Sequence, residues 1–312
     1  MLAEGDLHRP VMVFAFTGWN DAGEGASKAL RSMVTHWQAT PLAEVDPEPF
    51  TDFATVRPTV YLEDGRRHIR WPTVRVFSAS LPGSDVIFVL GPEPALRWRM
   101  FAEQIVGLAN RFGVSMAISL GALLADVPHT HPVKVIGTAS DPELIDRFEL
   151  HPPTYEGPTG IVGVIHDAFG DAGTPSASLW ATVPGYAAQI PSPKACEALM
   201  RVSCSMIGTT LPVGGFSRAV AEYEARVAAL VADNDDLASY VSRLETLMAD
   251  DLDDDDGHGD VIGGDDDTAT PGERPLTLGA EEVDPQTFVA EVEQFLRESG
   301  GDETPGATEP DR

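Results

Sequence analysis

Apolar runs of strand length alternate with segments of helical repeat along the first two thirds of the chain. Helices are expected from Asp21 to about Trp37, from about Leu96 to Phe112 and near 160–169. Strands that are apolar at nearly every position are buried on both faces, as in a parallel sheet covered by helices. The pattern therefore predicts an α/β fold, with a mostly parallel sheet flanked by helices. The runs expected to form strands are VMVFAF at 11–16, VRVFSA at 74–79, VIFVLG at 86–91, VSMAISLG at 114–121, KVIGT at 134–138 and SLWATV at 178–183.

The segment VYLEDGRRHIRW at 60–71 has a different pattern. Two arms in which polar and apolar residues alternate flank Asp64-Gly65, a dipeptide that suits a two-residue hairpin turn. We expect an antiparallel hairpin at an edge of the sheet.

From Pro193 onward the pattern is helical, and we expect a core domain of residues 1–192 followed by a helical part of residues 193–249. Residues 217–248 predict one long helix or a helical pair that bends near 233–236. Spacings of three and four alternate there, as in the a/d seam of a coiled coil with an Asn at one a position. The seam is covered either by packing within its own domain or by another subunit or partner. Its apolar members are Val220, Tyr223, Val227, Leu230, Leu237, Val241, Leu244 and Met248.

The C-terminal sixty residues are acidic and poor in apolar side chains. Residues 250–283 are rich in Asp, Gly and Thr, which predicts a disordered loop. Residues 284–298 carry an apolar stripe behind Asp284, a possible helix cap, so we expect a short helix that docks on the domain. Residues 299–312 are expected to be a disordered tail.

The formal net charge is −28, of which residues 250–312 carry −18. Phosphate backbones and anionic lipid surfaces repel such a chain, and there is no run of Lys and Arg beyond Arg66-Arg67. The charge therefore argues against nucleic acid and membranes as partners.

Cys196 and Cys204 are the two cysteines, and they lie eight residues apart in a helical segment. That spacing separates them by about 12 Å along the helix axis, too far for a disulfide. No signal-peptide pattern opens the chain, and no apolar stretch approaches twenty residues. We expect a cytoplasmic protein with reduced thiols.

The first candidate site is the turn Gly-Trp-Asn-Asp-Ala-Gly at 18–23, between a strand and a helix. Ligands of α/β folds bind where such turns meet helix N-termini, so Trp19, Asn20 and Asp21 are candidates to line a pocket. The phosphate-binding patterns GxxxxGK[ST] and GxGxxG are absent, and Asp21 with Glu24 makes an acidic first turn. The alternative is structural, a helix start resembling a capping box.

Two further groups of candidate residues follow a strand or enter a helix. Glu93 and Trp98 come after the 86–91 run, where a helix start is the alternative role. Gly157, Thr159 and Gly160 enter the helix near 160–169, where backbone amides could meet an anion or glycines could allow close packing.

His129, with Asp126 and His131 nearby, suits metal ligation or acid–base chemistry, although loop histidines of this kind are commonly solvated or hydrogen-bonded. No third or fourth metal ligand is close in sequence, so no metal site is predicted. There is no GxSxG elbow and no SxxK pattern, and neither a catalytic set nor a cofactor is predicted.

Several motifs in one order resemble the actinobacterial branch of the proteasome assembly chaperone 2 family. They are GWNDAG at 18–23, LGPEP at 90–94, LGALLADVPHT at 120–130, YEGPTGI at 155–161 and PSPKA at 191–195. The resemblance implies a phosphorylase/hydrolase-like α/β domain with a helical C-terminal part. It also implies a homo-oligomer, with a trimer as one form.

Two features depart from the family pattern. Relatives that assist proteasome assembly can use a C-terminal hydrophobic-Tyr-X tail, whereas this sequence ends in EPDR. Gly185 stands where bacterial relatives often carry histidine.

Two functional hypotheses result. The first is a non-catalytic chaperone or adaptor-like protein that contacts a protein partner, with proteasome subunits among the candidates. The alternative is a small-molecule-binding protein or enzyme that uses a crevice at the carboxyl ends of the strands.

Overall fold

The structure is a computed structural model that describes residues 7–211 and 216–253. All described elements belong to one compact unit, so the boundary predicted between residues 192 and 193 stays a prediction. The predictions for the 284–298 helix, the 299–312 tail and the 250–283 loop beyond Asp253 lie outside the described residues.

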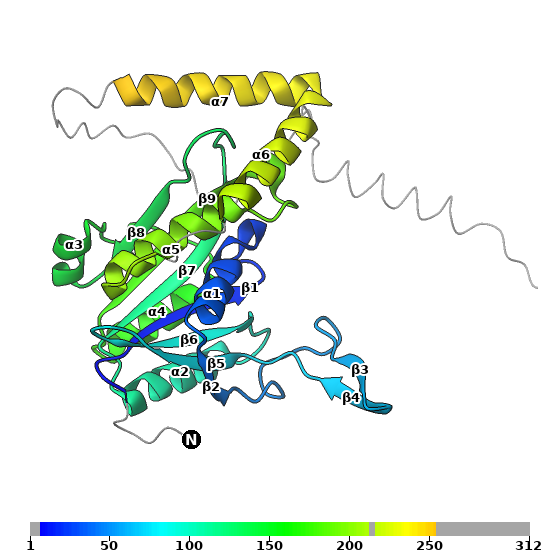
Figure 1. The fold of residues 1–312 in the computed structure, drawn as a ribbon. Helices are drawn as coiled ribbons and strands as arrows, with labels where there is room; N and C mark the ends of the chain where they lie inside the picture. Colours follow the sequence, from blue (N-terminus) through cyan, green and yellow to red (C-terminus); the bar gives the residue numbers. More distant parts are fainter. Residues whose placement is uncertain (1–6, 212–215, 254–312) are drawn as a thin grey trace, which may run out of the picture. The chain divides into compact units, whose positions relative to one another are not determined.

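A seven-stranded sheet forms the centre, in the order β2-β5-β6-β1-β7-β9-β8 (Figure 1). Strand β1 pairs in parallel with β6 and β7, and β7 pairs in parallel with β9. Strands β5 and β8 run antiparallel to their neighbours. The predicted α/β class with a mostly parallel sheet is confirmed. The strands are β1 Val11–Thr17, β2 Thr40–Glu44, β5 Arg75–Ser80, β6 Asp85–Pro92, β7 Met116–Ala125, β8 Val135–Ala139 and β9 Ser176–Pro184.

Helices cover both faces of the sheet, because the strands are apolar on both. Along β1, Val13 and Ala15 face the core beneath α1 and α5, while Phe14 and Phe16 face the core beneath α2 and α4 (Figure 1). A shorter helix, α3, lies beside β8. The helices of these layers are α1 Gly25–His36, α2 Trp98–Phe112, α3 Pro142–Phe148, α4 Ile161–Asp171 and α5 Pro193–Ile207, with 3-10 turns η1 Ala22–Glu24 and η2 Gly185–Ala187.

Some elements differ from the sequence-based prediction. Strand β2 and helix α3 were not predicted, although α3 has a clear start: the Asp141 side chain accepts hydrogen bonds from the amides of Glu143 and Leu144. Helix α2 begins at Trp98 rather than near Leu96, because Arg97 has a φ of 54° and cannot continue a right-handed helix.

The predicted hairpin is confirmed as β3 Thr59–Glu63 paired with β4 Arg66–Arg70. Asp64 and Gly65 connect the strands with φ angles of 51° and 73°, the double positive φ of a type I′ turn. The hairpin forms a separate two-stranded sheet rather than an edge of the main one.

The helical C-terminal part is a pair, α6 Phe216–Ala232 and α7 Asp235–Asp253. Asn234 separates the two helices, and its Oδ1 accepts a hydrogen bond from the amide of Leu237. Of the predicted seam, Tyr223, Val227, Val241 and Leu244 are buried within the chain itself. Because Leu230 is 42% exposed, the seam is only partly covered, and its role in subunit contact stays a prediction.

Candidate functional site

The parallel strands β1, β6, β7 and β9 end on the same side of the sheet. Asn20, Glu93 and His129 follow β1, β6 and β7, whereas Gly160 lies at the start of α4. The structure divides these residues into two groups of contacts. One joins Asn20, Glu93 and Gly160, and the other surrounds His129.

The strand-end cluster, Asn20 with Glu93 and the first turn of α4, connects three distant segments. Glu93 Oε1 accepts a hydrogen bond from Asn20 Nδ2 at 2.8 Å and another from the amide of Ile161 at 2.9 Å. Gly160 lies so close to Asn20 that a Cβ atom there would be 2.2 Å from Asn20 Oδ1. The carboxylate thus holds the ends of β1 and β6 against the N-terminus of α4, where a negative charge is favoured.

Asn20 is fully buried, and its Oδ1 has no hydrogen-bond donor within the described residues. Such an atom carries a desolvation cost of about 1–3 kcal/mol. No group in residues 7–211 and 216–253 compensates that cost.

Asp21 has the structural role that was one of its two predicted alternatives. Its Oδ1 accepts from the amides of Ala26 and Ser27 at 2.9 and 3.0 Å, in the first turn of α1. Burial raises the pKa of this carboxyl above its usual range, and the hydrogen bonds oppose that shift. Glu24 does not complete a capping box, since it pairs with Lys28 at 3.0 Å instead.

The remaining candidates near this edge do not join the cluster through hydrogen bonds. Trp19 is 58% exposed, and Gly157 and Thr159 are exposed. Trp98 is half-buried and donates its Nε1 hydrogen to the carbonyl of Pro94 at 2.6 Å.

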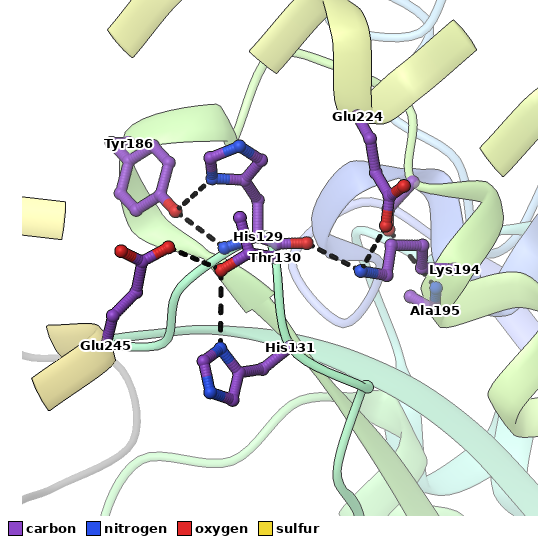
Figure 2. A network of polar contacts seen from close by, with 9 residues as sticks. His129, Thr130, His131, Tyr186, Lys194, Ala195, Glu224 and Glu245 are labelled. Atoms are coloured by element: carbon purple, nitrogen blue, oxygen red, sulfur yellow. Dashed lines mark hydrogen bonds and ion pairs between the residues drawn. The ribbon is translucent and has the colours of Figure 1, made fainter. Parts of the chain in front are cut away.

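His129 belongs to a second group, which we call the His129 network (Figure 2). Its backbone amide donates to the Tyr186 hydroxyl at 2.8 Å, and its Nδ1 lies 3.0 Å from the same oxygen. Because that oxygen already accepts from the amide, its hydrogen is free to point at Nδ1. Neutral His129 with the proton on Nε2 fits this geometry.

The network ties the loop after β7 to three helices. Lys194 on α5 donates to the His129 carbonyl at 2.5 Å and to Glu224 on α6 at 2.7 Å. Thr130 donates to Glu245 on α7 at 2.6 Å (Figure 2). The adjacent Tyr240, also on α7, donates to Asp126 at 2.7 Å.

A cavity of about 40 Å³ lies beside this network. Residues of the loop after β7, the end of β9, α5, α6 and α7 line it, among them His129, Lys194 and Met248. A space of this size holds a few water molecules but no metabolite. The contacts at His129 therefore fix the helical pair in place rather than form an open binding pocket.

Burial lowers the pKa of His129, and the nearby Lys194 charge adds to the shift. The unfolded chain binds a proton near pH 6.5, whereas folded His129 resists it, so stability is expected to fall as the pH drops below about 6.5. His129→Asn, whose Oδ1 can replace Nδ1, is expected to remove part of this slope, since burial lowers the pKa of His166 as well. NMR titration checks the cause directly: a His129 pKa at or above 6.5 would contradict it.

Lys194→Met is expected to lower the free energy of unfolding by about 1–2 kcal/mol, because it leaves the His129 carbonyl without its donor. The pair with Glu224 adds little, since that carboxylate is 42% exposed. Glu224→Gln is the matched control and should cost less than about 0.5 kcal/mol by urea denaturation. Equal losses for the two variants would show that the ion pair, and not the carbonyl contact, matters.

Sequence patterns did not predict the partners of His129. Tyr186 follows β9, and Lys194 lies in the PSPKA motif, so both had a local signal. Glu224 and Glu245 had none, because their contacts depend on how α6 and α7 fold back.

Within residues 7–211 and 216–253, no three His, Cys, Asp or Glu side chains are grouped so that they could hold a metal ion. In the same part of the chain, none of the helices combines the length and the apolar character needed to cross a membrane. Cys196 and Cys204 are both free, which confirms that they do not bridge.

The sheet with helices on both faces defines a three-layer α/β protein, and comparisons with known proteins identify its family. The sequence model of the PAC2 family matches residues 15–231, more than half of the chain. The chain therefore belongs to the PAC2 family, as the motif resemblance predicted. A comparison with curated proteins found no match.

Two crystal structures of actinobacterial proteins are similar over 74% of this chain and 99% of each of theirs. A PAC2 family protein from Streptomyces avermitilis is 42% identical with a TM-score of 0.69. A proteasome-assembly chaperone homologue from Mycobacterium tuberculosis is 38% identical with a TM-score of 0.67. PbaB from Pyrococcus furiosus, an archaeal proteasome activator, is 16% identical over 72% of this chain and 94% of its own, and its TM-score of 0.60 shows the fold alone.

Proposed function

We propose that this protein is a non-catalytic, chaperone-like adaptor that binds proteasome components in the cytoplasm as a homo-oligomer. The observation that carries the proposal is the 38% identity to a proteasome-assembly chaperone homologue over 74% of the chain. PAC2 family membership over residues 15–231 is consistent with it.

The geometry of the candidate residues also favours a binding role. Glu93 Oε1 accepts two structural hydrogen bonds, and Asp21 Oδ1 accepts from two amides in the first turn of α1. A general acid or base needs a free group within reach of substrate, whereas these two oxygens hold elements of the fold together. The exposed Trp19, by contrast, suits a contact with another protein, where tryptophan is enriched.

A reconstitution with the purified α and β proteasome subunits of the same host tests the proposal. We expect an equimolar amount of the chain to bind free subunits and to change the rate at which core particles form on native gels. Unchanged assembly together with no binding to either subunit would overturn the proposal. Serum albumin at the same concentration controls for non-specific effects.

The alternative, a small-molecule site at the strand ends, is supported by one observation, the buried Asn20 Oδ1 that lacks a donor. A ligand that supplied a donor there would have to enter between Asn20 and Gly160. A metabolite panel that raises the melting temperature of the wild type but not of Trp19→Ala would favour this alternative. Since Trp19 is exposed, its replacement should not disturb folding.

A further inference from the structure

The β3–β4 hairpin has one polar and one apolar face, as alternation along its strands requires. On the polar face the rings of Tyr61 and His68 stack at 5.4 Å, and the Arg70 guanidinium lies 4.8 Å from the Tyr61 ring centre. The opposite face carries the cross-strand pairs Val60 with Ile69 and Leu62 with Arg67, and Trp71 continues it. This second set, which we call the apolar hairpin face, consists of Val60, Leu62, Arg67, Ile69 and Trp71.

Nothing in the described part of the chain covers the apolar hairpin face. Every residue from 62 to 71 is exposed, with Leu62 at 75% and Ile69 at 51%. Strands β3 and β4 pack extensively only on each other, and Figure 1 shows the hairpin standing apart from the central sheet. The rings of Phe53 and Trp71 pack edge to face at the base of the hairpin, with 5.1 Å between their centres.

Two general properties of proteins indicate that another surface covers this apolar face. A two-stranded hairpin alone in water is marginally stable and needs packing against another surface. Clustered apolar side chains on a surface mark interaction sites. Since water solvates the polar side chains of the other face well, the apolar face is the side on which a partner would bind.

The charge of the hairpin indicates which partner fits. Residues 59–70, which form the hairpin, hold three arginines against one glutamate and one aspartate, a net charge of +1. The other residues of the segment 1–249 together carry −11. A second copy of this chain therefore offers the hairpin a surface of opposite sign. Because salt limits such interactions to about 8 Å, the local charges at the contact matter more than the repulsion between whole subunits.

We infer that a second copy of this chain covers the apolar hairpin face, with Arg67, the arginine on that face, facing acidic residues of that copy. This inference rests on the homo-oligomeric form proposed above, and it does not depend on the proteasome as partner. Two five-residue strands present a face of about 17 by 10 Å, less than the roughly 800 Å² that each partner contributes to a stable interface. The hairpin is thus the apolar centre of a larger contact with a charged rim.

Light scattering coupled to size-exclusion chromatography, applied to the full chain over a range of concentrations, tests the inference. The wild type is expected to associate, and Leu62→Asp is expected to raise the dissociation constant about tenfold or more. Thr59→Asp is the matched control, because it places the same charge on the opposite face of the same strand, and it should associate as the wild type does. Arg67→Glu, on the apolar hairpin face, should also weaken association and reduce its dependence on salt.

The light-scattering results distinguish the hairpin interface from the homo-oligomeric form itself. A wild type that stays monomeric at high concentration would overturn both the hairpin interface and the homo-oligomeric form, and would mean that a different protein covers the face. An oligomer that Leu62→Asp leaves intact would overturn the interface alone. Leu62 is exposed, so its variant should keep the wild-type circular dichroism and melting temperature, and loss of association cannot then be ascribed to unfolding. None of these results bears on binding of proteasome subunits.

Discussion

Replacing Glu93 with alanine is expected to lower the free energy of unfolding by about 3 kcal/mol. The substitution removes the one acceptor shared by Asn20 Nδ2 and the Ile161 amide, and Asn20 is fully buried. Two donors would then be left unsatisfied at the point where β1, β6 and α4 meet. Urea denaturation with a fitted m value measures the loss.

The matched variant Glu93→Gln keeps a carbonyl oxygen as acceptor and removes only the charge. It should lose clearly less stability than Glu93→Ala. If both variants stay within about 0.5 kcal/mol of the wild type, as substitutions at an unimportant surface site do, the strand-end cluster does not hold these elements together.

Replacing Val227 with aspartate is expected to release α6 and α7 from the rest of the domain. Val227 is fully buried on α6 and packs in one cluster with Tyr223 and Ala187. An unpaired carboxylate cannot remain there without a cost of several kcal/mol. Hydrogen exchange should show lost protection in α6, α7 and the loop that carries His129, while the central sheet stays protected.

Leu230→Asp is the control for this variant, because Leu230 lies on the same helix and is 42% exposed. It should leave exchange in α6 and α7 unchanged. Equal loss of protection in both variants would mean that the helical pair is held by its exposed side, as in a subunit contact through the predicted seam. Unchanged protection in Val227→Asp would contradict the packing described above.

The main sheet could be predicted from the sequence, because burial on both faces leaves a continuous apolar run. Strands β1, β6, β7 and β9 are such runs, and the Asp64-Gly65 turn identified the hairpin through its need for positive φ. Strand β2 was missed since it lies at the edge of the sheet, is largely exposed and contains a proline.

The candidate sites were harder to predict, because their contacts join segments far apart in the sequence. Gly160 and Asn20 each had a local explanation, a helix start and a turn, but their contact depends on how α4 packs beside β1. The loop that carries His129 contacts α7, which begins about a hundred residues later, through the hydrogen bond from Thr130 to Glu245. Local spacing carries no information about such a contact, so the pattern suggested a solvated loop histidine or a ligand.

The central claim is that the protein binds proteasome components. Native mass spectrometry of the tagged chain, isolated gently from the cytoplasm of its own host, tests it most directly, because one spectrum reports subunit number, bound proteins and retained small molecules. The account predicts a homo-oligomer that carries proteasome subunits in fixed stoichiometry. A bare chain with a reproducible small-molecule mass and no proteasome subunit would contradict it.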